Sequence, residues 1–508
     1  MLPNRNLIAN ILGQSWVAFV GLAFVPVYID RLGVEAYGLI GFYILLQVWF
    51  SVLDLGMSTT TNREMSRARA GVIGPDAVGD LLRSLEIVVI VIASCVALGL
   101  FVSAEPIARY WLELEALSLH NVIGALQAIA FVVASRFCEG LYRGALFGLE
   151  RQVFYNLAFA GLSTLRYSGA ALIVIVLPSI EAFFLWQAGV SMASVAVFAI
   201  ATHVTRPRAE RRPRFSAAAV QSIGGFAGGL SLTTLIALVF TQIDKVMLSR
   251  MVDLESFGLY MIAFTLAGVF AMMTVPISSS FFPRLTVATA TGDRKAERYL
   301  FHAGAQLVAI FACPLLAVML IAGEPLVHAW TGDAQLAQEV SSVLALLAVG
   351  GFCNAMLQIP YMLQLSHGWT TLSVRINFLA ALLLIPSVYL GVSAFGIVGA
   401  AVAWAGVNLI VFALGTIAMH RRLLPDERML FLWDAVAIPL FASGSVVGAF
   451  TLFMPDEITR IGGGLLVLAA LCAAFLSTII ATPIGRVGVR HILAVIRLRV
   501  VSKPRSTL

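Results

Sequence analysis

The feature that most constrains this chain is a succession of long apolar runs joined by short polar connections. A helix needs about 20 apolar residues to cross the hydrocarbon core of a bilayer. Only helices and closed barrels satisfy every backbone hydrogen bond in lipid, so runs of this length predict membrane-spanning helices. The predicted spans are 8–29, 38–56, 84–103, 119–146, 155–178, 181–203, 222–249, 257–281, 299–321, 339–366, 371–392, 396–418, 430–454 and 460–482. We therefore expect an all-α polytopic membrane protein with about 14 transmembrane helices.

Composition excludes a large soluble domain, because 60% of the residues are hydrophobic and only 12% are charged. A soluble domain carries about 25% charged residues. The net charge of +6 has to be interpreted by location in such a chain and does not indicate a nucleic-acid partner. The five cysteines fall within apolar runs, and the seven histidines form no close cluster, so no metal site is expected.

The positions of Lys and Arg predict the orientation. With the N-terminus in the cytoplasm, the predicted outer loops hold only Arg31, Arg109, Arg250 and Arg460 of the 33 Lys and Arg residues. Most of the others fall in predicted cytoplasmic segments. This distribution predicts that both termini are cytoplasmic.

An internal repeat divides the chain. Residues 27–39 recur as residues 246–259, and Glu105, Pro106 and Trp111 recur as Glu324, Pro325 and Trp330. A repeat of this length indicates two homologous halves. Six spans precede the second half, so it enters the membrane in the same orientation as the first, which predicts a parallel repeat.

The repeat and a basic, proline-containing linker predict the domain boundaries. The predicted segments are an N-terminal six-helix bundle (1–203), a basic cytoplasmic linker (204–215), a C-terminal six-helix bundle (216–418), two extra helices, 13 and 14 (429–482), and a basic cytoplasmic tail (483–508).

Charged residues within the predicted spans are the candidate functional groups. An arginine at the centre of a membrane helix costs about 2.5–3.5 kcal/mol on insertion scales. Arg136, Glu139 and Arg143 share one face of the fourth span, because they lie at positions i, i+3 and i+7. The other charged residues at depth are Asp54, Arg166, Asp244, Lys245, Arg375 and Asp434.

Two interpretations of these charges stay open. They could be internal ion pairs, with Arg136 and Arg143 flanking Glu139. Asp244 and Lys245 are not expected to pair, because adjacent helical residues point apart. Alternatively, a surplus of positive charge lines a central cavity that accepts an anionic head group such as a pyrophosphate, for which arginine is suited.

Three stretches resemble the polysaccharide or O-antigen flippases of the multidrug/oligosaccharidyl-lipid/polysaccharide exporter superfamily. They are residues 31–40, residues 53–57 leading to Asn62 and Arg63, and residues 396–403. The resemblance covers about residues 1–420. The last pair of spans is similar to the fourteen-helix lipid II flippases, so the subfamily stays open.

The resemblance implies a V-shaped pair of bundles with a cationic lumen in a bacterial cytoplasmic (inner) membrane. It implies translocation of a polyprenyl-pyrophosphate-linked oligosaccharide from the inner to the outer leaflet, with membrane lipids and other polysaccharide-assembly proteins as partners. The substrate-binding candidates are Arg136, Arg143, Arg166, Lys245 and Arg375. The candidates for coupling to a proton or a sodium ion are Asp54, Glu139 and Asp244; no catalytic residue and no other cofactor is expected.

Two other functions are alternatives to a flippase. A multidrug/cation antiporter of the same superfamily would favour acidic and aromatic lumen residues. A membrane-embedded polysaccharide polymerase or ligase would need a large outer loop, whereas the largest one predicted here is 104–118. The repeated stretch is expected to be a structural corner, in which Arg31, Glu35, Arg250 and Glu255 fix a turn.

Overall fold

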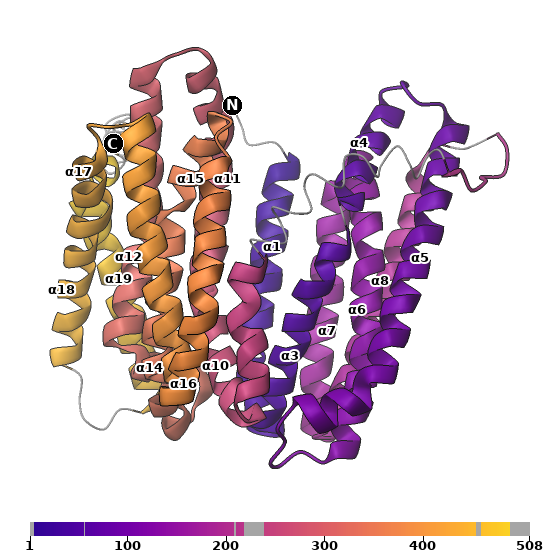
Figure 1. The fold of residues 1–508 in the computed structure, drawn as a ribbon, viewed down its shortest axis with the longest axis horizontal. Coiled ribbons are helices and arrows are strands. Elements are labelled where there is room, and N and C mark those ends of the chain that lie inside the picture. Colours follow the sequence, from indigo (N-terminus) through magenta and orange to yellow (C-terminus); the bar gives the residue numbers. More distant parts are fainter. Residues whose placement is uncertain (1–4, 55, 208–209, 218–237, 454–458, 488–508) are drawn as a thin grey trace, which may run out of the picture. The chain divides into compact units, whose positions relative to one another are not determined.

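The computed structural model describes residues 5–54, 56–207, 210–217, 238–453 and 459–487 (Figure 1). The chain separates into two compact units, Met1–Met261 and Ile262–Leu508. Within the described residues every regular element is a helix, which confirms the predicted all-α fold. The predicted domain boundaries stay predictions.

Twelve helical segments among the described residues are long and apolar enough to cross a membrane. The chain is therefore a multi-pass membrane protein. One segment, α16 (Thr371–Leu423), contains 53 residues and has non-helical backbone at Phe395 and Gly396, so it accounts for two of the predicted spans. Most of the predicted span 222–249 lies outside the described residues. The count of fourteen and the repeat layout stay predictions.

The first unit is built around helix α6. Figure 1 shows its neighbours α5 and α8 beside it, and α4, α3 and α7 also pack against it. The elements of this unit are α1 (Arg5–Ala23), α2 (Val25–Leu32), α3 (Val34–Ser51), η1 (Val52–Asp54), α4 (Met57–Arg69), α5 (Pro75–Pro106), η2 (Ile107–Trp111), α6 (Leu119–Gly148), α7 (Gln152–Val176), α8 (Ile180–Thr205), helical residues 238–251 and the start of α10 (Leu254–Ala267).

The second predicted span ends in a break that redirects the chain into a polar helix. After η1 the chain passes Gly56, whose φ of 76° favours glycine, and then enters α4. Helix α4 lies directly against α6, because a Cβ at Gly144 or Gly148 would meet the carbonyl oxygen of Ser58 or Asn62. Small residues permit this close approach of two helices.

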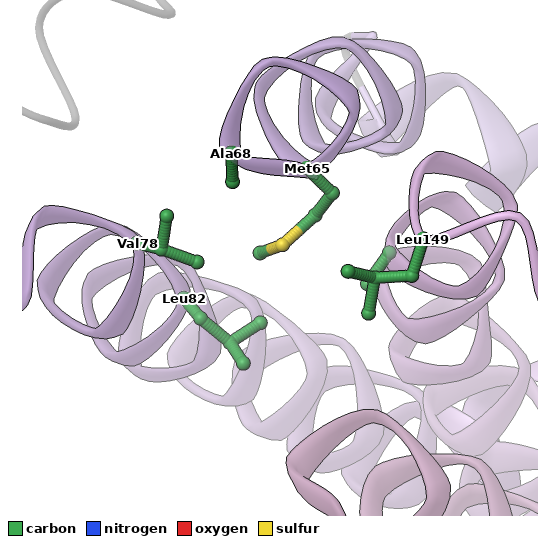
Figure 2. Close-up of a cluster of buried hydrophobic side chains, with 6 residues drawn as sticks. Met65, Ala68, Val78, Leu82 and Leu149 are labelled. Atoms are coloured by element: carbon green, nitrogen blue, oxygen red, sulfur yellow. The ribbon is translucent and has the colours of Figure 1, made fainter. Parts of the chain in front are cut away.

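A buried apolar cluster holds the far end of α4. Met65 and Ala68 of α4 pack against Val78 and Leu82 of α5 and against Leu149 at the end of α6. Figure 2 shows Met65 pointing between α5 and Leu149. Helix α5 begins at Pro75, nine residues before the predicted span 84–103. The predicted span omits these first turns because they are polar and do not belong to an apolar run.

The two copies of the repeated stretch touch each other in the first unit. A Cβ at Gly38 would meet the carbonyl oxygen of Leu254, and a Cβ at Gly258 would meet the carbonyl oxygen of Val34. Gly38 corresponds to Gly258, and Val34 to Leu254, so the contact is reciprocal. We call this contact the glycine crossing.

Both copies also hold the loop that follows η2. The Glu35 carboxylate accepts hydrogen bonds from the backbone N–H groups of Glu115, Ala116 and Leu117, at 2.8, 2.7 and 2.9 Å. From the second copy, the N–H of Leu254 donates to the carbonyl oxygen of Glu113 at 2.9 Å. Glu35 therefore fixes a loop distant in sequence as well as beginning its own helix.

The described part of the linker lies along the first turns of α5. Backbone N–H groups of Glu210 and Arg211 donate to Asp76. The N–H of Arg214 donates to Asp80 at 2.7 Å, and that of Ser216 donates to the Ser84 hydroxyl at 2.8 Å. Asp76, Asp80 and Ser84 are spaced at four-residue intervals, so they share one face of α5.

The second unit contains the rest of α10, then α11 (Val269–Ala290), α12 (Arg294–Ile321), α13 (Gly323–Thr331), α14 (Ala334–Met356), α15 (Gln358–Ser366), α16, α17 (Arg428–Phe431), η3 (Leu432–Ala437), α18 (Ile438–Leu452) and α19 (Arg460–Ala481). The last two helices pack on α12 through buried residues that include Val318, Val447 and Val467. Arg460 also donates to the carbonyl oxygens of Ala329 and Trp330. The predicted extra helix pair is thus packed into this unit.

Candidate functional site

A cavity of about 490 Å³ lies within the first unit, where the break in the second span faces α6 and α7. It joins three of the candidate residues of the fourth span to Asp54 of the second. Its lining residues are Gln47, Phe50, Ser51, Asp54, Ser58, Val133, Arg136, Phe137, Glu139, Gly140, Arg143, Tyr155 and Phe159. Two guanidinium groups, two carboxylates and four aromatic rings therefore meet at one site.

Asp54 is held at the start of α4. The Ser58 hydroxyl lies 2.7 Å from Asp54 Oδ1 and 2.9 Å from the carbonyl oxygen of Gly140. The backbone N–H of Ser58 donates to the same carboxylate at 3.3 Å. A carboxylate at the first turn of a helix satisfies unpaired N–H groups there. Asp54 thus links the helix break to α6 at the cavity wall.

Arg136 and Glu139 form an ion pair at the cavity. Arg136 Nη1 lies 3.3 Å from Glu139 Oε2, and the Tyr155 hydroxyl donates to Glu139 Oε1 at 3.3 Å. The guanidinium lies 5.9 Å from the ring centroid of Phe159. Arg136 Nε has no hydrogen-bond partner among the described residues.

Arg143, in contrast to Arg136, forms no ion pair within the part of the chain that the structure describes. It is exposed and lines the same cavity. Of the cavity carboxylates, Glu139 pairs with Arg136 and Asp54 caps α4. Arg143 is therefore the cation of the cavity that stays available to a ligand.

Arg166 lies away from the cavity lining, in the interior of the first unit, where 2% of its surface is exposed. Its Nη2 donates to the Ser194 hydroxyl of α8 at 3.2 Å. Its Nε and Nη1 have no hydrogen-bond partner among the described residues, nor do the buried hydroxyls of Ser163 and Ser191.

Asp244 and Lys245 form a pair that the sequence analysis did not predict. They form a buried ion pair, with Lys245 Nζ 3.0 Å from Asp244 Oδ1. The prediction that they do not pair was wrong, because the long lysine side chain turns back along its helix and Nζ also donates to the Thr241 carbonyl oxygen at 2.9 Å. The Tyr260 hydroxyl donates to Asp244 at 2.7 Å. Neither residue lines the cavity.

Arg375 and Asp434 belong to the second unit. Arg375 is exposed on α16, and Asp434 is part of η3. The first-unit cavity therefore contains Arg136, Arg143, Glu139 and Asp54 of the predicted site, without Arg166, Lys245, Asp244 or Arg375. Among the described residues, no group of His, Cys, Asp and Glu could hold a metal ion.

Sequence reasoning missed the aromatic part of the cavity. Tyr155 and Phe159 stack on each other with ring centroids 5.5 Å apart. Their i, i+4 spacing at the start of the fifth span was the available signal. That spacing is common on apolar helices, so it did not distinguish them from residues that face lipid or other helices.

Comparisons with known proteins agree with this fold. The family model described as polysaccharide biosynthesis protein matches residues 4–288, and the MatE model matches residues 230–390. A putative O-antigen transporter of Shigella flexneri is 19% identical over 417 residues, covering 81% of this chain and 96% of that protein.

Solved structures show the same fold at low identity. A lipid II flippase MurJ in an inward closed conformation matches with a TM-score of 0.71 and 12% identity, covering 92% of this chain and 97% of that one. An inward-facing multidrug resistance MATE family transporter matches with a TM-score of 0.64 and 11% identity, covering 82% and 96%.

Proposed function

Because this chain belongs to the polysaccharide biosynthesis protein family, we propose that it is a flippase for a lipid-linked oligosaccharide. The substrate is a polyprenyl-pyrophosphate-linked oligosaccharide used for O-antigen, capsule or exopolysaccharide. It moves from the inner to the outer leaflet of a bacterial cytoplasmic membrane by alternating access. The name of the Shigella relative supports the substrate class.

The observation that carries this proposal is Arg143, a cation without an ion pair among the described residues, facing a cavity inside a membrane unit. Charged groups at membrane depth are costly and mark substrate or ion pathways. A pyrophosphate diester carries two negative charges and several acceptor oxygens, which match the donors of a guanidinium. Arg143 is therefore the first contact for the pyrophosphate, and Arg136 is the second.

The size and lining of the cavity fit the start of the head group. About 490 Å³ is within the range of small-ligand sites, about 300–1,000 Å³. It accommodates a pyrophosphate and the first sugar, and a longer glycan extends beyond it. Phe50, Phe137, Tyr155 and Phe159 offer apolar surface to that sugar.

The other candidates keep separate roles in this proposal. Asp54 and Glu139 lie at the cavity and are the candidates for coupling to a proton or a sodium ion. Asp244 stays a candidate, although it is buried against Lys245. Arg166, Lys245 and Arg375 stay candidates for later steps of translocation, after the pyrophosphate has left Arg143.

The test replaces Arg143 by Ala in a cell that depends on the protein. Surface polysaccharide should fall at least about tenfold, because an uncompensated loss of about 1.4 kcal/mol or more in substrate binding corresponds to that factor. Arg143→Lys should keep part of the activity, because the charge remains. Arg109→Ala is the matched control, since Arg109 is exposed and pairs with Glu105. Wild-type export by Arg143→Ala at equal protein level would contradict the proposal.

A multidrug/cation antiporter is the second candidate, favoured by the MatE match and by the two carboxylates of the cavity. Efflux of a cationic dye separates the two functions. A flippase leaves dye accumulation unchanged when Asp54 is replaced by Asn, whereas an antiporter loses efflux.

A further inference from the structure

We propose that the interior of the first unit binds a halide ion, chloride under physiological conditions, between helices α7 and α8. Its ligands are the guanidinium of Arg166 and the hydroxyls of Ser163 and Ser191. This inference goes beyond the proposed function and does not rest on it, because Arg166 lies away from the cavity lining. It assigns Arg166 a ligand that is separate from the translocated head group.

The first support is the charge of Arg166. Its side chain is buried, and no ion pair forms to it within the described part of the chain. Arginine keeps its positive charge in proteins, and a buried charge is costly unless it is paired. Nη2 donates to the Ser194 hydroxyl at 3.2 Å, whereas Nε and Nη1 have no hydrogen-bond partner among the described residues. This guanidinium therefore calls for a negative charge and has two nitrogens free to bind it.

The second support is the behaviour of the hydroxyls on the same two helices. A serine or threonine inside a helix commonly donates to the carbonyl oxygen one turn before it. Five of the seven on α7 and α8 do so, each to the carbonyl four residues before at 2.7–2.8 Å: Thr164, Ser168, Ser194, Thr202 and Thr205.

Ser163 and Ser191 are the two exceptions. Both are buried, and neither hydroxyl has a hydrogen-bond partner among the described residues. Each lies three residues before a member of the Arg166–Ser194 pair, Ser163 on α7 and Ser191 on α8. The hydroxyls that do not bond to their own helix are thus the two that neighbour the uncompensated arginine.

Helix geometry places these donors together. Residues three apart share one face of a helix, so Ser163 lies on the face of Arg166, and Ser191 on that of Ser194. Helical side chains lean toward the N-terminus, which carries the guanidinium over the turn of α7 that holds Ser163. Its hydrogen bond to Ser194 brings it against α8, where Ser191 is only about 4.5 Å away along the helix axis.

The donor set fits a small anion. Ser194 already gives its proton to the Val190 carbonyl oxygen, so it supports Arg166 as an acceptor only. The remaining groups are two guanidinium nitrogens and two hydroxyls, all of which donate. A water molecule accepts from such donors but leaves the positive charge uncompensated. A halide ion accepts from several donors at once and supplies one negative charge in a single atom, beside side chains as small as serine.

The experiment measures thermal unfolding of the purified full-length protein in detergent, in sodium chloride and in sodium gluconate of equal ionic strength. Gluconate is too large for a site between two packed helices. Chloride should raise the melting temperature of the wild type by at least about 3 °C, because an ion that binds the folded state stabilises it. Bromide should replace chloride. Equal melting temperatures in chloride and gluconate would show that the arginine is merely hydrated, and the inference would fail.

Variants locate the ion. Arg166→Gln should lose the difference between chloride and gluconate, and the double variant Ser163→Ala/Ser191→Ala should lose at least half of it. The double variant decides the question if Arg166→Gln does not fold. Ser168→Ala is the matched control on α7, because its hydroxyl is bonded to its own helix, and it should keep the full difference.

The cavity offers a competing location for the same ion, since Arg143 lines it without an ion pair among the described residues. Arg143→Ala should therefore keep the chloride effect. A chloride effect that disappears in Arg143→Ala and persists in Arg166→Gln would overturn the inference and place the anion in the cavity. Crystals grown in sodium bromide give a direct check, because the anomalous signal of the bromide should lie beside Arg166.

Discussion

Asp80 of helix α5 and Arg211 of the linker form a bidentate ion pair, in which Nη1 and Nη2 of the guanidinium each donate to one carboxylate oxygen. Because the guanidinium of Arg211 donates to the Asp80 carboxylate, the pKa of Arg211 is raised above its ordinary value. The same carboxylate accepts from the backbone of Arg214. A single aspartate therefore anchors two points of a segment that has no regular structure between residues 210 and 216.

Asp80→Asn should release this segment. The linker holds several arginines at which trypsin cuts, and a protease cleaves backbone that is freed from its contacts. We expect cleavage in the linker to become several-fold faster, measured by electrophoresis of the purified protein. Asp30→Asn is the matched control, because Asp30 is an exposed carboxylate paired with Arg31. Equal cleavage rates for the two variants would show that Asp80 does not anchor the linker.

Gly144→Ala should destabilise the first unit. The added methyl group would meet the backbone of Ser58, so α4 has to move away from α6. Overpacking of this kind costs about 1–3 kcal/mol. Thermal unfolding in detergent measures the effect. Gly161→Ala is the control, since a Cβ there meets nothing within 4 Å, and its melting temperature should be unchanged or higher.

Asp244 and Lys245 should behave as one structural unit. Removing one partner of a buried ion pair costs about 3–5 kcal/mol, because the other charge stays buried and unpaired. We therefore expect Asp244→Asn and Lys245→Met each to lower the melting temperature strongly. The double variant should be less destabilised than the sum of the two. Additive losses in this double-mutant cycle would mean that the pair does not contribute as a pair.

Glu35→Ala should destabilise the loop between η2 and α6 without changing the substrate. Three backbone N–H groups lose a charged acceptor, and hydrogen bonds to charged groups contribute about 1.5–3 kcal/mol each. Glu255→Ala, at the corresponding position of the second copy, removes an exposed side chain and should cost less. A changed glycan preference in Glu35→Ala would contradict a structural role for this corner.

The sequence predicted best what depends on spacing along one helix. Arg136, Glu139 and Arg143 were expected on one face because their spacing matches the helical period, and all three line one cavity. The apolar runs likewise predicted the helices, since crossing a membrane requires a minimum length.

What the sequence could not predict depends on side-chain conformation or on contacts between helices. Asp54 reaches α6 only because the chain breaks at Gly56 and continues into the polar helix α4. The pattern of apolar runs predicts neither the break nor this helix. The fold-back of Lys245 depends on rotamers of a long side chain. The isolation of Arg166 from the cavity depends on how α7 and α8 pack. The sequence does not encode that packing in a readable pattern, so it does not distinguish Arg166 from the arginines of the neighbouring span.

The glycine crossing has a consequence for how this chain can vary. Gly38 is the packing surface of Leu254, and Gly258 is that of Val34, so each copy of the motif is the other's binding partner. Two identical chains related by a two-fold axis make contacts of the same reciprocal kind. A substitution in one copy therefore acts on the other, and the two cannot diverge independently at these positions. Among natural variants, residues 34–41 and 254–261 should change together or not at all.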